Sequence, residues 1–156
     1  MESEDLPNEM PNEMPDEWAT LWQLIRRVAG SMDRQGEALF RRELGISLAQ
    51  FLVLSVVDAY PGPLSQQAVA DRLGLTKGTV SRQIEAAVSA GLMTVQVAAH
   101  TRRENAVSLT KAGATLVRAG DDLVKHSRAP MLKAIDPTQF PAVVATLQAM
   151  LAELEP

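Results

Sequence analysis

None of the 156 residues of the chain is a cysteine. This absence excludes disulfide bonds, thiolate zinc sites, cysteine nucleophiles and sensors that work by thiol oxidation. The two histidines, His100 and His126, therefore lack the partner side chains that a zinc site or a catalytic site needs. We expect no bound metal and no cofactor.

Long apolar runs and the common motifs of catalysis are also missing. No stretch approaches the roughly 20 apolar residues that cross a bilayer, and the first residues lack the pattern of a signal peptide. The sequence has no phosphate-binding glycine loop, no nucleophile beside a base and no paired carboxylates. We therefore expect a cytoplasmic protein that has no membrane partner and is not an enzyme.

Charge is distributed unevenly along the chain. Residues 1–20 hold seven acidic side chains and no lysine or arginine, and since the whole chain carries −4, the remaining residues carry +3. The acidic segment contains a repeated four-residue motif, whose first copy is Pro-Asn-Glu-Met. Each copy begins with a proline, which interrupts a helix. We predict a disordered acidic tail over residues 1–16, followed by a modestly basic remainder.

The first half of the chain carries start and stop signals for helices. Apolar residues with helical spacing begin at Trp18 and predict one long amphipathic helix to about Glu43. Ser47 and Gln50 form a capping box for a second helix, which residues 61–63 (Pro-Gly-Pro) end. Two short helices should follow.

These short helices each have a side chain that can cap the first turn. Ser65 and Thr76 are the expected N-caps, and Gly74 turns the chain between the two helices. Beyond them, residues 93–97 and 105–109 alternate apolar and polar side chains around a basic tip, which predicts a two-stranded ribbon.

Two more helices are expected after the ribbon. Thr110 should cap a long helix that Pro130 kinks or ends, and Thr138 is the favoured cap of the last helix. The last helix carries an apolar stripe with three-four spacing, which is typical of a helix that meets another helix. The predicted fold is mainly α, with about six helices and a two-stranded β wing.

A helix, a glycine turn, a second helix and a basic hairpin, in this order, make a winged helix-turn-helix, whose second helix enters the major groove of DNA. With Val80, Ile84, Ala87 and Val88 as the buried face, Arg82 lies on the opposite side, where its fork can bind guanine O6 and N7. The candidate DNA-binding residues are Ser65, Gln66, Thr76, Lys77, Gly78, Thr79, Ser81, Arg82, Arg102 and Arg103.

The run LSQQAVADRLGLTKGTVSRQIEAAVSAGLM, followed by HTRRENAVSLTKAG, resembles the core of regulators of the MarR family. In that family the wing commonly reads D-R-R-x-x-x-V-x-L-T. The residues that match this pattern here are Arg102, Arg103, Val107, Leu109 and Thr110. The resemblance covers roughly residues 45–115 closely.

This resemblance implies a sequence-specific transcription regulator bound to double-stranded DNA of the nucleoid. Members of the family are homodimers whose first and last helices interlock, and many are repressors that a small, often aromatic, ligand releases from a pseudo-palindromic operator. We expect residues 17–46 and 111–156 to form the dimerisation region, and residues 47–110 to form the DNA-binding lobe. The alternative is a winged-helix module that binds a protein and little or no DNA.

Two further sets of residues follow from the family's plan. The predicted dimer contacts are Trp18, Leu21, Phe140, Val144, Leu147, Leu151 and Leu154. The predicted ligand pocket is lined by Trp18, Trp22, Arg26, Met32, Phe51 and Leu116. In the pocket, an arginine would pair with a ligand carboxylate and the apolar side chains would hold the ring.

Overall fold

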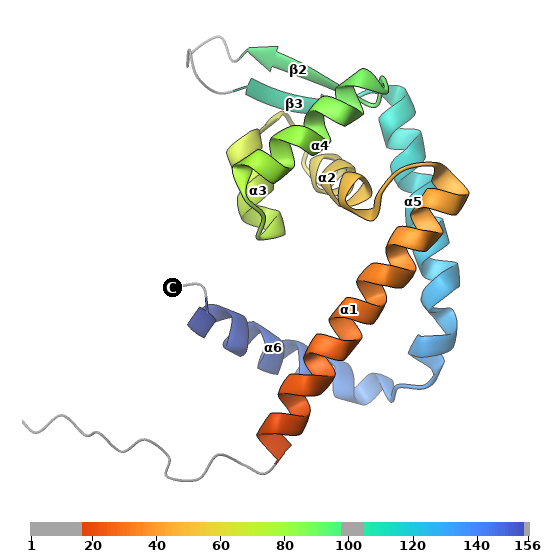
Figure 1. Ribbon diagram of the computed structural model, residues 1–156, viewed down its shortest axis with the longest axis vertical. Coiled ribbons are helices and arrows are strands. Elements are labelled where there is room, and N and C mark those ends of the chain that lie inside the picture. Colours follow the sequence, from red (N-terminus) through yellow and green to blue (C-terminus); the bar gives the residue numbers. More distant parts are fainter. Residues whose placement is uncertain (1–16, 98–104, 155–156) are drawn as a thin grey trace, which may run out of the picture. The chain divides into compact units, whose positions relative to one another are not determined.

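The computed structural model describes residues 17–97 and 105–154 (Figure 1). These residues form six α-helices, three short strands and one 3-10 turn, so the predicted helical content is confirmed. The chain divides into two compact units, Met1–Ala49 and Gln50–Pro156. Within the described ranges, no helix is long and apolar enough to cross a membrane.

The first unit contains helix α1 (Glu17–Leu44) and the first residues of helix α2 (Leu48–Asp58). The Glu37 carboxylate accepts a hydrogen bond from the Leu48 backbone N–H at 2.8 Å and one from Arg41 Nε at 2.7 Å. The bond from Leu48, with the help of Arg41, holds the pKa of Glu37 below its ordinary value. The start of α2 is thus capped by a side chain of α1, a contact that sequence patterns did not indicate.

Two glycines allow the turn between α1 and α2. Gly45 has φ +70°, in the left-handed region that side chains rarely adopt. At Gly36, an added Cβ would lie 2.9 Å from Leu48 Cδ2, so the absence of a side chain lets Leu48 approach α1. Gly36 would weaken an isolated helix, but here its lack of a side chain allows Leu48 to pack against α1.

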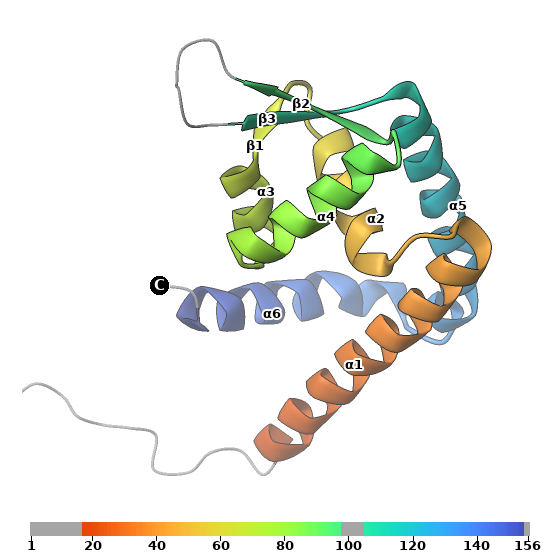
Figure 2. The same ribbon diagram turned by 45° about the horizontal axis from the view of Figure 1, so that its top comes forward.

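In the second unit, α2, α3 (Gln66–Leu73) and α4 (Lys77–Ser89) contribute to a core next to a small sheet (Figure 2). Three hydroxyls cap helices as predicted: Ser65 accepts from the Ala68 N–H at 3.1 Å, and Thr76 accepts from the Thr79 N–H at 3.2 Å. Thr110 caps α5 (Lys111–Lys133) in the same way. The fully buried apolar residues of this unit include Val53, Leu54, Val69, Val80, Ile84, Met93, Val107 and Val117.

The sheet has one more strand than expected. Strands β2 (Met93–Val97) and β3 (Asn105–Leu109) form the predicted antiparallel ribbon, with Met93 opposite Leu109. The short strand β1 (Leu64–Ser65) pairs with the other edge of β3, giving the order β1-β3-β2. The prediction of a two-stranded wing was therefore incomplete, because Leu64 is both part of the buried core and a strand residue.

The C-terminal helices depart from prediction in two details. Helix α5 continues for three residues beyond Pro130, so the proline, which removes one backbone hydrogen bond, does not end the helix. The cap before helix α6 (Phe140–Leu154) is Asp136 rather than Thr138. The Asp136 carboxylate accepts both the Thr138 N–H and the Thr138 hydroxyl, at 2.9 and 2.8 Å, so that hydroxyl is not the cap.

Gly120 allows helix α5 to pack closely against the core. A Cβ added at Gly120 would overlap the Phe51 ring of α2. The aromatic ring therefore packs directly against the backbone of α5, and Phe51 is only 5% exposed. This packing fixes α5 to the rest of its unit.

Candidate nucleic-acid interface

Helix α4 has one buried face, which sets the direction of the other. The buried face consists, as predicted, of Val80, Ile84 and Ala87. The turn before the helix contains the exposed Gly74, which has φ +60°. Val88 was also predicted to be buried, but it is 38% exposed. At 100° per residue it lies about 80° around the helix from Val80, so it falls on the flank of the core face.

The face of α4 opposite the core carries Gly78 and Arg82, and Lys77 lies at the edge of that face. All three residues are exposed. A Cβ added at Gly78 would meet nothing within 4 Å, so the surface there is open to an approaching molecule. Within the part of the chain that the structure describes, Arg82 forms no hydrogen bond or ion pair that would hold its guanidinium against the protein.

The hydroxyl groups around α4 are partly engaged within the protein. Thr76 and Thr79 hydroxyls lie 2.9 Å apart, and Ser81 donates a hydrogen bond to Glu85 Oε1 at 3.3 Å. The Ser65 hydroxyl is used in capping α3, and Gln66 beside it is half-buried. Among the polar candidates, the charged side chains are therefore the ones most available to a partner.

The basic residues of the lobe fall into two groups. The Arg72 guanidinium lies over the Tyr60 ring, 4.2 Å from its centroid, and donates to the Ala68 carbonyl at 3.0 Å. It is held along α3, whereas Lys77 and Arg82 project from exposed positions on α4. The predicted wing contacts, Arg102 and Arg103, lie outside the described residues.

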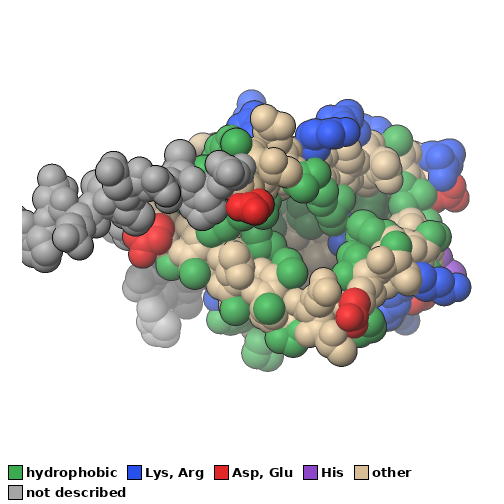
Figure 3. Space-filling view, turned by 90° about the horizontal axis from the view of Figure 1, so that it is seen from below, with side chains coloured by type: hydrophobic (Ala, Val, Ile, Leu, Met, Phe, Trp, Pro, Cys, Tyr) green, Lys and Arg blue, Asp and Glu red, His purple; other side chains and the backbone are tan. Residues whose placement is uncertain are grey.

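The predicted dimer contacts are accessible in the single chain. Trp18 and Leu21 of α1 are exposed, and on α6 the side chains of Val144, Leu147, Leu151 and Leu154 are between 44% and 67% exposed. Phe140 is half-buried. Figure 3 shows hydrophobic side chains at the surface between scattered charged ones.

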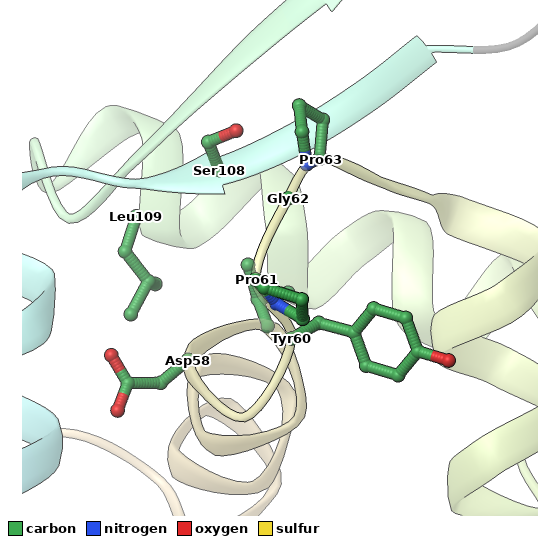
Figure 4. Close-up of a pocket in the computed structure, with 8 residues that line it drawn as sticks. Asp58, Tyr60, Pro61, Gly62, Pro63, Ser108 and Leu109 are labelled. Atoms are coloured by element: carbon green, nitrogen blue, oxygen red, sulfur yellow. The ribbon is translucent and has the colours of Figure 1, made fainter.

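The predicted ligand pocket draws residues from both units, and it stays a prediction. In the second unit, Phe51 is buried against Gly120, while Leu116 lines a shallow hollow of about 510 Å³ with Leu92 and Lys111. A further cavity of about 230 Å³, which the sequence did not indicate, opens between the end of α2 and β3. Figure 4 shows Leu109 reaching toward Asp58 there, across from residues 61–63.

Comparison with known proteins finds a family model and solved structures that are similar to this chain. The model of the MarR family matches residues 44–104. MepR of S. aureus in complex with DNA is 23% identical, with a TM-score of 0.77 over 86% of this chain and 98% of that one. A MarR family transcriptional regulator from Streptomyces coelicolor in complex with DNA is 16% identical, with a TM-score of 0.84 over 96% and 94% of the chains.

A third solved structure, a mutant of E. coli MarR, is 25% identical to the chain. Its TM-score is 0.67 over 87% of this chain and 96% of that one. The structural likenesses agree with the winged-helix fold, and the family match covers the helix-turn-helix and the first wing strand. The resemblance drawn from the sequence motifs is confirmed.

Proposed function

We propose that the chain, whose residues 44–104 match the model of the MarR family, is a sequence-specific DNA-binding transcription regulator. The observation that carries the proposal is the two-faced helix α4. Its buried valine and isoleucine orient Lys77, Gly78 and Arg82 outward on an open surface. A helix with this arrangement can enter the major groove, where an arginine recognises guanine.

Roles within the interface follow from charge and position. We assign base reading to Arg82, because it is exposed and unpaired among the described residues. Lys77 at the first turn of α4 would bind phosphate, as would Arg102 and Arg103 of the wing. Ser65, Gln66, Thr76, Thr79 and Ser81 complete the proposed contact surface.

We also propose that two chains associate through α1 and α6. The exposed apolar side chains of these helices would be buried by a second copy, in a dimerisation region of residues 17–46 and 111–156. A two-fold dimer presents its two recognition helices about 34 Å apart. The lobes of residues 47–110 would then read a pseudo-palindromic site with half-sites one helical turn apart.

The decisive experiment is selection of duplexes from a random library by the purified protein, followed by binding of the selected duplex at several salt concentrations. Enrichment of an inverted repeat, with log affinity falling linearly with log salt, is the expected result. No enrichment and no salt dependence would support the alternative, a winged-helix module that binds a protein.

We also propose that the protein represses transcription and that a small aromatic acid releases it from DNA. Its pocket would involve Trp18, Trp22, Arg26, Met32, Phe51 and Leu116. A ligand lowers DNA affinity only by favouring a subunit arrangement that DNA does not, and a tenfold loss needs about 1.4 kcal/mol of such preference. A thermal-shift screen of aromatic acids, followed by duplex binding with each hit, tests it. A hit that leaves duplex affinity unchanged contradicts the coupling.

A further inference from the structure

The end of α4, strand β3 and the start of α5 lie close together (Figure 2), and Thr110 bonds to the segments on either side of it. Its hydroxyl donates a hydrogen bond to the Gly91 carbonyl at 2.7 Å and accepts one from the Gly113 N–H at 3.1 Å. Its backbone N–H donates to the Leu92 carbonyl at 3.0 Å. One threonine therefore bonds both to the turn after α4 and to the first turn of α5.

The turn that Thr110 contacts is itself bonded to α4. The Leu92 N–H donates to the Ala87 carbonyl at 2.9 Å, and the Gly91 N–H donates to the Val88 carbonyl at 2.9 Å. Gly91 adopts φ +72°, which keeps this turn tight. A continuous chain of hydrogen bonds thus runs from the last turn of α4 through Thr110 to α5.

Gly113 brings the two elements into direct contact. A Cβ added at Gly113 would overlap the Leu92 carbonyl oxygen, and it would lie 3.4 Å from Leu109 Cδ2. The backbone of α5 therefore touches the turn after α4 where any larger residue would push them apart. Gly62, in contrast, has open space for a Cβ and an ordinary φ.

We propose that Thr110 and Gly113 are positioning residues that lock the recognition helix α4 to the start of α5. The inference rests on the proposed function, because α5 leads into the proposed dimerisation region and α4 is the proposed reader. With this lock, the spacing of two α5 helices in a dimer sets the spacing of the two reading faces. Without it, each α4 can tilt on its own, and the base contacts lose their alignment while phosphate contacts persist.

Substitutions at Thr110 separate the lock from the helix cap. Serine can both donate and accept, so Thr110→Ser should behave as the original chain. An ionised aspartate is a good N-cap for Gly113 but has no proton for the Gly91 carbonyl, so Thr110→Asp keeps the cap and removes the bond to the turn. Thr110→Val removes both bonds. Thr115→Asp places the same charge one helical turn along α5, at an exposed site, and serves as the control.

The measurement is the ratio of affinities for the duplex selected by the original chain and for a random duplex of equal length. We expect Thr110→Asp and Thr110→Val to lose about tenfold in this ratio, the scale of one misaligned base contact, while Thr110→Ser and Thr115→Asp keep it. Gly113→Ala should lower the ratio as well, and Gly62→Ala should not. Folded Thr110→Asp that keeps the full ratio would overturn the proposal.

Hydrogen exchange distinguishes failure of the lock from failure of the proposed function. If the original chain selects no duplex, the function fails, but the lock still predicts faster exchange of the Leu92 amide in Thr110→Asp than in Thr115→Asp. This measurement is made on the purified full chain in its own oligomeric state, and it needs no DNA. Equal exchange of Leu92 in the two variants would show that Thr110 only caps α5.

Discussion

Helices α4 and α6 belong to the same unit and are 13 and 15 residues long, yet they use their apolar side chains in opposite ways. Helix α4 buries Val80, Ile84 and Ala87 and exposes its charges. Helix α6 is the more apolar of the two, with Glu153 as its one charged residue, but it buries none of its side chains. Apolar composition alone therefore does not locate the core of this chain.

The difference teaches that the two helices face different partners. A contiguous exposed apolar stripe on a helix is the usual mark of a protein interface, whereas an exposed charged face over a packed core suits a polyanion. In this chain the apolar stripe of α6 is the proposed dimer surface, and the outer face of α4 is the proposed DNA-binding surface. Three substitution experiments test this contrast, and a fourth tests the cap of α2.

The largest effect is expected from charging the stripe of α6. Leu147→Glu with Leu151→Glu would place four carboxylates in a two-fold seam, and each buried leucine contributes about 2 kcal/mol to association. We expect loss of the dimer in light scattering together with loss of binding to the selected duplex. Gln148→Glu, on the same helix, is the control. A double variant that remains dimeric would show that α6 does not form the seam.

The second test compares two apolar residues of α4 itself. Ile84 is fully buried, so Ile84→Ala should lower the free energy of unfolding by about 2 to 5 kcal/mol. Val88 lies on the flank and is largely accessible, so Val88→Ala should cost less than about 1 kcal/mol. Denaturant unfolding followed by circular dichroism measures both. Equal losses would mean that Val88 is buried in the protein in solution.

The third test addresses the outer face of α4. Arg82→Ala should weaken binding to the selected duplex by about 1 to 3 kcal/mol and relax its sequence preference, while Arg102→Ala should weaken binding to all duplexes similarly. Ser89→Ala, at the last turn of α4, is the control. Titrations at one fixed salt concentration measure these effects. Equal losses on selected and random duplexes for Arg82→Ala would remove its assignment as the base reader.

The smallest effect is expected at Glu37, outside both helices. Because its folded pKa lies below the ordinary value, its contribution is present at neutral pH and is lost as the pH falls through that lowered pKa. Glu37→Gln should therefore lower stability at pH 7 by at most about 1 kcal/mol, since the side chain is partly exposed. The difference between the two proteins should shrink as the pH falls through that lowered pKa. A difference that persists at acid pH would exclude the charged cap as its cause.

Local chemistry explains what the sequence predicted. Ser65, Thr76 and Thr110 cap helices because a short hydroxyl side chain can satisfy the free N–H groups of a first turn wherever it occurs. The ribbon was predicted with the bounds that β2 and β3 have, since alternation depends only on neighbouring residues. The exposure of Arg82 followed from helical periodicity in the same way.

Contacts between distant residues account for what the sequence missed. Glu37 caps α2 from 11 positions away, and β1 forms only because Leu64 meets Val107. Asp136 replaced Thr138 as a cap because its carboxylate satisfies two groups of that threonine at once. From the sequence alone, Gly113 would only lower the stability of a helix. The structure shows that its lack of a side chain makes room for the Leu92 carbonyl.

Strand β1 also sets an order of assembly during folding. The β2–β3 ribbon and the pair α3–α4 each close over short stretches of chain, so they can form early at little entropic cost. The Leu64–Val107 pairing encloses both of them, and its larger loop must close after they have shortened the path between its ends. Loop entropy therefore predicts that the pairing of β1 with β3 forms late in folding, and this pairing connects the start of α3 to the wing.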